Sequence, residues 1–236
     1  MKIALLGYGK MGKVIERIAL ERGHEIVLRK SSSDSYNGLE NAEIAIDFSI
    51  PNAAVSNISE CLQNNIPIVS GTTGWLVDYP KMVALCEEKK GAFIYGSNFS
   101  LGVNLFFELN DYLAKMISKF NQYSVSIEEI HHTQKIDTPS GTAISLANGI
   151  IENSNYSDWS LDKNSNENSI YIDAQRIENV PGTHSIFCKS EVDTIEIKHT
   201  AHNRDGFALG SVIAAEWLVG KRGVFTMRDV LELKLL

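Results

Sequence analysis

The sequence predicts an α/β protein in which a doubly wound parallel sheet is joined to a second α+β domain with a mostly antiparallel open sheet. Three observations support this prediction. Apolar runs alternate with amphipathic stretches over roughly the first hundred residues. A glycine-rich turn, "GYGKMG", separates the first apolar run from the first amphipathic stretch. After residue 168, strand-like runs follow one another at short spacing, so the alternation of strand and helix ends there.

The first three predicted elements surround the glycine-rich turn. Residues 2–6 are predicted as a buried strand, Met11 to about Gly23 as a helix, and residues 25–29 as a second strand. At this place Gly7 lets the chain turn, Gly9 lets the backbone approach a pyrophosphate, and Gly12 lets the helix pack on the strand. This arrangement predicts a Rossmann-type dinucleotide site, the alternative being a tight turn that happens to hold three glycines. The expected contacts are Gly7, Tyr8, Gly9, Lys10, Met11 and Gly12.

The end of the second strand indicates which dinucleotide is used. An acidic residue usually binds the ribose 2′-hydroxyl there. Here the segment is "LRKSSSD", in which Arg29, Lys30 and Ser31 occupy the position and Asp34 comes late. Cations and hydroxyls favour a 2′-phosphate, so we expect NADPH, or use of both NADPH and NADH, with Arg29 as a contact. The alternative is that Arg29 and Lys30 form a solvated strand end.

The alternation continues with strands over residues 42–49, 66–74 and 92–100 and helices over 51–65 and 79–91. The loops "DFS", "GTTG" and "GSNFS" follow the three strands, and ligands of parallel sheets bind at the carboxyl ends of strands. We therefore expect cofactor or substrate contacts in all three loops. The expected contact residues are Asp47, Gly71, Thr72, Thr73, Gly96, Ser97, Asn98 and Phe99.

The second half of the chain has a different pattern. We expect a helix over residues 101–120, a strand over 123–132, a helix over 140–152 with Ser140 as its N-cap, and a surface loop over 153–168. Strands at hairpin spacing follow over 169–177, 183–190 and 193–201. We place the domain boundary near residue 103. Residues 1–103 form a dinucleotide-binding domain, which a C-terminal helix (about 207–236) rejoins, and residues 104–206 form a substrate-binding and oligomerisation domain.

Composition excludes several classes of protein. The formal net charge of −7 lacks the basic excess of nucleic-acid-binding proteins. No apolar run reaches about 18 residues, so we expect no membrane span, and the start of the chain has no signal-peptide cleavage site. The cysteines, Cys61, Cys86 and Cys188, are odd in number and far apart, with neither a disulfide framework nor a zinc spacing. A cytoplasmic protein without a metal is expected.

The stretch "EEIHHTQKIDTPSGTA", residues 128–143, is the predicted chemical centre. Histidine passes protons near neutrality, and a partly desolvated lysine becomes a better general acid. Serine, glycine and threonine at a helix N-terminus offer N–H groups and a hydroxyl to a carboxylate. Together they predict a site that holds and protonates an anion while a nicotinamide supplies hydride. Asp137 either orients the loop, neutralises Lys135 or is a plain turn residue.

Two alternatives to proton transfer remain for the histidines. The pair could be structural, with satisfied N–H groups at a strand end. It could also bind a metal, but only Asp137 and the distant His184, His199 and His202 could complete the shell, and no ligand spacing supports this.

The motif "HHTQKIDTPSGTA" resembles the signature of the dihydrodipicolinate reductase family. The resemblance covers nearly the whole chain, through "GYGKMG", "DFS", "GTTG", "SNFSLGVN", "PGTH" and "IEIKHTAHNRDGFALGSVIAAEWL". It implies NAD(P)H-dependent reduction of 4-hydroxy-tetrahydrodipicolinate, a cyclic dicarboxylate, in lysine and diaminopimelate biosynthesis. It also implies a Rossmann domain, an α+β domain and a homotetramer built on the open sheet.

The resemblance assigns roles to matching positions. His131 and Lys135 become the proton-handling groups, and the substrate contacts are His132, Ser140, Gly141 and Thr142. The loops at residues 71–73 and 96–99 would lie by the nicotinamide and its ribose, and Arg204 and Phe207 would approach the cofactor. This chain departs from the family pattern in lacking an evident ribose-binding acid, in having Thr138 where alanine is common, and in shorter loops around residues 31–42 and 153–168.

Two rival functions follow from the same pattern. An amino-acid dehydrogenase that acts on oxaloacetate and ammonia would use the same scaffold, although the His-His-Lys and Ser-Gly-Thr groups argue against it. A non-catalytic nucleotide sensor would have no need of the proton-handling groups.

Overall fold

The structure is a computed structural model that describes residues 1–31 and 34–233. The chain divides into two compact units, Met1–Leu101 with Arg204–Leu236, and Gly102–Asn203. The boundaries expected from the sequence, near residues 103 and 207, lie beside these. The last three residues of the expected C-terminal segment lie outside the described residues. The functional roles expected of the two units remain predictions at this point.

Unit 1 contains a six-stranded parallel sheet with the strand order β11-β5-β4-β3-β1-β2. The order reverses at β1, because β2 lies on one side of it and β3 on the other, which makes the sheet doubly wound as predicted. The strands are β1 (Lys2–Leu6), β2 (Glu25–Lys30), β3 (Ile44–Asp47), β4 (Ile68–Ser70), β5 (Ala92–Tyr95) and β11 (Gly223–Phe225).

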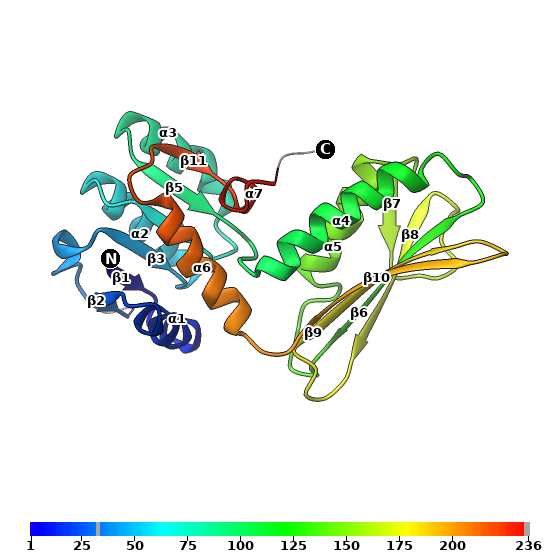
Figure 1. Cartoon of the computed structure of the whole chain (residues 1–236), viewed down its shortest axis with the longest axis horizontal. Helices are drawn as coiled ribbons and strands as arrows, with labels where there is room; N and C mark the ends of the chain where they lie inside the picture. Colours follow the sequence, from blue (N-terminus) through cyan, green and yellow to red (C-terminus); the bar gives the residue numbers. More distant parts are fainter. Residues whose placement is uncertain (32–33, 234–236) are drawn as a thin grey trace. The chain divides into compact units, whose positions relative to one another are not determined.

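Helices cover both faces of this sheet (Figure 1). On one face α1 (Lys10–Glu21) and α6 (Asp205–Leu218) pack on side chains such as Ile3 and Leu5. On the other face α2 (Pro51–Gln63) and α3 (Tyr79–Glu88) pack on Ala4 and Leu6. Strands that are buried on both faces have continuous apolar runs, and such runs allowed the strands of this unit to be predicted from the sequence. Two short 3₁₀ helices, Leu39–Asn41 and Leu76–Asp78, and α7 (Met227–Val230) complete the unit.

The C-terminal part of unit 1 differs from the prediction. The expected C-terminal helix, about residues 207–236, is shorter in the structure, where α6 begins at Asp205 and ends at Leu218. The chain then forms β11, which pairs with β5, and α7, and neither of these elements was predicted. The apolar run of β11, "GVF", is too short to predict a strand.

Unit 2 contains a five-stranded open sheet in the order β10-β9-β6-β8-β7. Its strands are β6 (Ser124–His131), β7 (Asp158–Ser160), β8 (Ser169–Arg176), β9 (Gly182–Lys189) and β10 (Thr194–Ala201). Helices α4 (Leu101–Ile117) and α5 (Gly141–Glu152) belong to its apolar core, on one face of the sheet (Figure 1).

The sheet of unit 2 is mixed, which corrects the expectation of mostly antiparallel strands. Strand β9 runs antiparallel to β6 and β10, but β8 runs parallel to β6 and β7. The hairpin spacing between residues 169–177 and 183–190 therefore does not form a hairpin, because β6 lies between β8 and β9. The predicted loop over 153–168 also contains the short edge strand β7. Within the described residues, no helix is long and apolar enough to cross a membrane.

Candidate active site

The glycine-rich loop of unit 1 has the close approaches that its glycines were predicted to allow. Gly7 has φ +100°, and a Cβ there would lie 2.2 Å from the carbonyl oxygen of Phe48. A Cβ on Gly12 would lie 2.4 Å from the carbonyl oxygen of Gly7. A Cβ on Gly9 would meet no described atom within 4 Å, so that position is open. Helix α1 starts after Gly9 without a side-chain cap, which leaves first-turn N–H groups for an anion such as a pyrophosphate.

A cavity of about 280 Å³ lies beside this loop. Among the described residues that line it there is no carboxylate, and Lys30 is its one lysine or arginine. Lys30 is buried, donates to the carbonyl oxygen of Ser31 at 3.2 Å and lies 4.7 Å from the centre of the Tyr36 ring. The cavity is lined by Gly7, Tyr8, Gly9, Lys30, Ser31, Phe48, Ser49, Ile50, Ala53 and Asn57. These residues fit the adenosine end of a dinucleotide whose ribose carries an anion.

Arg29 does not line this cavity, and the expectation that it contacts the cofactor stays a prediction. Its Nε donates to Oε1 of Glu16 at 2.7 Å, and the hydroxyl of Tyr8 donates to the other oxygen of Glu16. The guanidinium holds the pKa of Glu16 below its usual value. Neighbouring residues of a strand point to opposite faces, so Lys30 turns to the cavity while Arg29 turns to α1.

Asp47 connects the loops that follow β3 and β4. Its carboxylate accepts hydrogen bonds from Ser49 Oγ (2.6 Å), Asn57 Nδ2 (2.8 Å), Ser70 Oγ (2.8 Å) and Thr72 Oγ1 (2.8 Å). Burial raises the pKa of Asp47, and the four hydrogen bonds oppose that change. Because Asp47 has no exposed surface and its oxygens are occupied, it supports the loops, and its expected direct contact with the cofactor stays a prediction.

The other expected contacts in unit 1 differ in exposure. Thr72 and Phe99 are buried, and Phe99 packs on Phe48 with ring centres 5.8 Å apart. Thr73, Ser97 and Arg204 are exposed, while Gly71, Gly96, Asn98 and Phe207 are partly exposed. Arg204 is the N-cap residue of α6, one of the helices that pack on the sheet. The buried members can shape the loops, and only the others have surface for a ligand.

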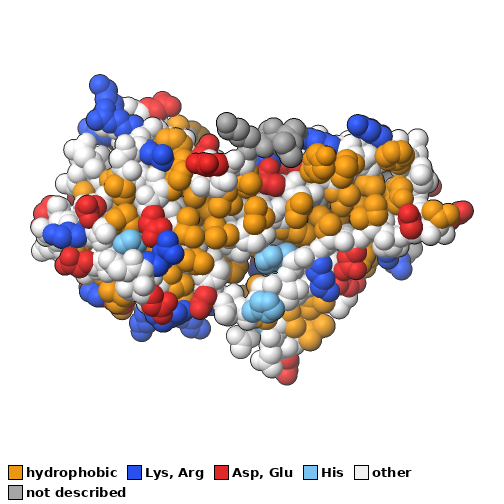
Figure 2. Space-filling view, viewed as in Figure 1, with side chains coloured by type: hydrophobic (Ala, Val, Ile, Leu, Met, Phe, Trp, Pro, Cys, Tyr) orange, Lys and Arg blue, Asp and Glu red, His pale blue; other side chains and the backbone are white. Residues whose placement is uncertain are grey.

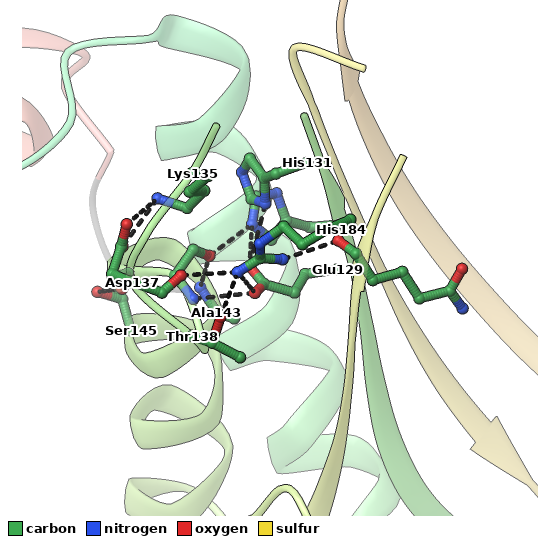
Figure 3. Close-up of polar contacts among 12 residues, drawn as sticks. Glu129, His131, Lys135, Asp137, Thr138, Ala143, Ser145 and His184 are labelled. Atoms are coloured by element: carbon green, nitrogen blue, oxygen red, sulfur yellow. Dashed lines mark hydrogen bonds and ion pairs between the residues drawn. The ribbon is translucent and has the colours of Figure 1, made fainter. Parts of the chain in front are cut away.

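In unit 2, strand β6 brings a carboxylate and a histidine into the interior. The strand alternates, so Val125, Ile127, Glu129 and His131 share the buried face. A buried carboxylate requires compensating partners. Oε2 of Glu129 lies 3.2 Å from His131 Nδ1 and 3.7 Å from His184 Nε2 (Figure 3).

The second oxygen of Glu129 is also occupied. Oε1 accepts from the backbone N–H of Ser140 at 3.0 Å and from Arg176 Nη2 at 3.2 Å. Burial alone would raise the pKa of Glu129, but the contacts from His131, His184 and Ser140 outweigh it and hold the pKa well below its usual range. The carboxylate is therefore a permanent negative charge beneath the histidines.

Arg176 continues this network into the loop between β6 and α5. Its Nη2 also donates to the carbonyl oxygen of Asp137 at 2.6 Å and to Thr138 Oγ1 at 2.9 Å. Within the loop, Lys135 Nζ donates to both carboxylate oxygens of Asp137 at 2.8 Å (Figure 3). Burial acts to raise the pKa of Asp137, but the contact with Lys135 lowers it overall. Of the readings left open for Asp137, the structure shows that it neutralises Lys135.

Ser140 is the N-cap of α5 as predicted, because its Oγ accepts from Ala143 N at 3.1 Å. The same Oγ lies 3.1 Å from His184 Nε2, and Ser140 is 2% exposed. Ser140 therefore supports the start of α5, and its expected direct contact with substrate stays a prediction. Gly141 is exposed and Thr142 half-buried at the start of α5. Half-buried His132 has an Nδ1 without a hydrogen-bond partner in the described part of the chain.

The sequence prediction missed Glu129 and Arg176 and considered His184 only as a distant metal ligand. The alternation of β6 was a usable signal for Glu129, because it places that residue on the same face as Ile127. Arg176 had no local signal, since β8 reaches the site by pairing with β6, where Arg176 lies opposite His131. Ligand atoms of Glu129, His131 and His184 lie within 4.8 Å of one another. Arg176 supplies positive charge to Glu129 from the neighbouring strand.

Comparison with known proteins is consistent along the whole chain. A family model described as "Dihydrodipicolinate reductase, N-terminus" matches residues 1–99, and one described as "Dihydrodipicolinate reductase, C-terminus" matches residues 102–231. The 4-hydroxy-tetrahydrodipicolinate reductase of Christiangramia forsetii is 56% identical over 234 residues, which is 98% of either chain. That of Thermosipho africanus is 34% identical over 234 residues, again 98% of either chain.

A solved structure has the same fold. A dipicolinate-bound dihydrodipicolinate reductase from Paenisporosarcina sp. aligns with a TM-score of 0.76 at 23% identity, over 97% of this chain and 98% of that one.

Proposed function

The chain belongs to the dihydrodipicolinate reductase family, and we propose that it reduces 4-hydroxy-tetrahydrodipicolinate to tetrahydrodipicolinate with His131 and Lys135 as its proton-handling groups. It is an oxidoreductase of lysine and diaminopimelate biosynthesis that uses NADH or NADPH. The observation that carries the assignment of the site is the clustering in unit 2 of two histidines, a lysine and an exposed helix N-terminus around a buried carboxylate.

The substrate is a cyclic dicarboxylate, and unit 2 has groups for both of its charges. One carboxylate fits at the start of α5, where Gly141 and Thr142 offer backbone N–H groups and the helix dipole favours an anion. His132, which is half-buried, and Lys135 supply a donor and a cation to the substrate. Ser140 holds the start of α5 in place as its N-cap.

Proton transfer falls to His131 and Lys135. Loss of the 4-hydroxyl as water leaves a C=C bond conjugated with the imine of the ring, and the reduced nicotinamide, when bound, would supply hydride to the far carbon of that system, C4. Hydride addition leaves an enamine, so a proton must then be added to the carbon next to the imine carbon, which restores the C=N bond of the product. His131 is held by Glu129 at the edge of the site, and Lys135 shares its charge with a half-exposed Asp137 that it can leave for the substrate. A positioned general acid contributes about 10²- to 10⁴-fold to the rate.

Unit 1 supplies the residues that would hold the dinucleotide. The loop from Gly7 to Gly12 and the uncapped start of α1 fit the pyrophosphate. The cavity lined by Lys30 and Ser31 fits the adenosine ribose, and Lys30 favours a 2′-phosphate there. We therefore propose a preference for NADPH over NADH.

The direct test is the oxidation of NADPH and NADH, followed by absorbance, in the presence of enzymatically generated 4-hydroxy-tetrahydrodipicolinate. We expect substrate-dependent oxidation of both cofactors. Activity with oxaloacetate and ammonia, and none with the cyclic substrate, would instead identify an amino-acid dehydrogenase. Dinucleotide binding without turnover of either substrate would identify a sensor.

We further propose that the chain forms a homotetramer through unit 2. An apolar stripe of this unit is exposed along α4 and just after it, and Figure 2 shows apolar side chains gathered there. The stripe consists of Leu105, Leu109, Tyr112, Met116 and Phe120. The outer face of the sheet adds Ile130, Tyr171 and Phe187, which are half-buried. Large exposed apolar surfaces mark contact sites between proteins.

Light scattering should therefore give four times the mass of the chain. Phe187→Glu tests the sheet face and Leu109→Glu tests the α4 stripe, and a monomeric mass for the unmodified protein would refute the proposal. We place the enzyme in the cytoplasm, where its buried free thiols, Cys61, Cys86 and Cys188, stay reduced.

A further inference from the structure

We propose that Glu129 is a positioning residue of the reductase, whose buried carboxylate orients the ring of His131, fixes the start of α5 and, through Arg176, anchors the loop that bears Lys135. This proposal rests on the proposed function, because it assigns a task within the same site. Glu129 itself has no exposed surface.

The burial of Glu129 is the first observation. The other members of its strand face, Val125 and Ile127, pack in the apolar core of unit 2, and an apolar side chain would continue that core. A buried charge is usually no more stabilising than an apolar residue of similar volume. The stability of the fold therefore does not explain why a carboxylate is buried at this position. The specific contacts of Glu129 explain it.

The contact with His131 is the second observation. Oε2 of Glu129 and Nδ1 of His131 are at ion-pair distance, 3.2 Å, without hydrogen-bond alignment, and catalytic contacts of this kind often align only when a ligand binds. A carboxylate at Nδ1 favours the proton on that nitrogen, which leaves Nε2 to exchange a proton. The ring fits because residue 182 is glycine: a Cβ there would lie 3.1 Å from His131 Nε2.

The remaining contacts link Glu129 to both substrate-binding segments. Oε1 holds the backbone N–H of Ser140, whose Oγ caps α5. It also holds Arg176, which binds the backbone at Asp137 and the hydroxyl of Thr138. One carboxylate thus connects the proton-handling ring, the carboxylate-binding helix start and the lysine loop.

Several charged groups surround His131 and must be counted in any pH profile. They are Glu129 on its own strand, Arg176 on β8, His184 on β9, His199 on β10 opposite His184, and Lys135 and Asp137 in the loop. Burial lowers the pKa of His184. Glu129 lies 3.2 Å from Nδ1 of His131 and is its anionic partner.

The test compares Glu129→Gln with Glu128→Gln in the full-length enzyme. Gln keeps the shape of the side chain and removes its charge, and Glu128 is the neighbour on the outward face of the same strand. For Glu129→Gln we expect kcat to fall about 10²-fold, with a shifted pH profile, while the Kd for NADPH stays within about 2-fold. For Glu128→Gln all of these should match the unmodified enzyme.

A second measurement does not depend on the variant folding. Nitrogen-15 spectra of the unmodified protein report which ring nitrogen of His131 is protonated, and Nδ1 is expected. Protonation at Nε2, or a kcat within about 3-fold for a folded Glu129→Gln variant, would overturn the proposal. An unmodified enzyme that failed to oxidise NAD(P)H with the cyclic substrate would instead refute the proposed function.

Discussion

Replacing Lys135 is the sharpest test of the proposed chemistry, because two variants separate its two proposed tasks. Its ammonium lies 2.8 Å from both oxygens of Asp137, and its side chain is 21% exposed. The proposed tasks are to bind a substrate carboxylate and to deliver a proton. Lys135→Ala removes both functions. Lys135→Arg keeps the positive charge but removes the proton donor, since arginine does not deprotonate in proteins.

The expected magnitudes differ between these variants. Loss of a charge-assisted hydrogen bond to a carboxylate corresponds to about 1.5–3 kcal/mol, or roughly 10- to 150-fold in Kd. Loss of general acid catalysis corresponds to about 10²- to 10⁴-fold in kcat. Lys135→Ala should therefore weaken binding of dipicolinate and lower kcat, whereas Lys135→Arg should lower kcat with a much smaller loss of binding.

Steady-state oxidation of NADPH and calorimetric titration with dipicolinate measure these two quantities. The matched control is Lys163→Ala, a lysine on the exposed loop before β8, which should change neither. Stability should hardly change in any variant, because Asp137 is 59% exposed and surface ion pairs contribute about 0–1 kcal/mol. If Lys135→Ala kept kcat within about 3-fold, the proton-handling role would be wrong.

Three other predictions test the rest of the account. Gly9→Ala should change the free energy of unfolding by no more than about 0.5 kcal/mol, because a Cβ at this position meets no neighbour. It should nevertheless raise the Kd for NADPH at least about 10-fold, because the Cβ would lie where the pyrophosphate binds. Equal affinity of the variant and the unmodified protein in a fluorescence titration would contradict the pyrophosphate site. Lys30→Ala should raise the KM for NADPH and leave the KM for NADH nearly unchanged. Arg29→Ala should alter neither KM, because the partner of Arg29 is Glu16. A Lys30→Ala variant with a raised KM for both cofactors would argue against a 2′-phosphate contact. The folded state lowers the pKa of His184, so the unfolded chain binds that proton more tightly. The free energy of unfolding should therefore be complete above about pH 6.5 and fall as the pH is lowered, and His184→Gln should flatten this slope in urea titrations.

The parts of the fold that were predictable are those with a repeated local pattern. Strands β1, β3, β4 and β5 are buried on both faces, so their apolar runs, the helices between them and the turn at Gly7 were visible in the sequence. Strands β7 ("DWS") and β11 ("GVF") lie at sheet edges and have neither a long apolar run nor a clear alternation, so the sequence did not predict them. The parallel pairing of β8 with β6 depends on contacts between distant segments, which spacing along the chain does not reveal.

The site was predictable where residue type and chemistry coincide. The residue types at His131, Lys135 and the N-cap Ser140 predict a proton-handling and anion-binding group. Glu129 does not, because two adjacent glutamates look equally solvated until the strand alternation separates them. The charge of Arg29 suggested a phosphate contact, which stays a prediction; the structure adds that Glu16 lies on the same side of the sheet and pairs with it.

The most direct test of the central claim is a crystal structure of the protein with NADPH and dipicolinate. We expect one carboxylate of the diacid within about 3 Å of the backbone N–H groups of Gly141 and Thr142, and the diacid in contact with His132 and Lys135. Dipicolinate bound away from the start of α5, with the histidines and Lys135 untouched, would contradict the account.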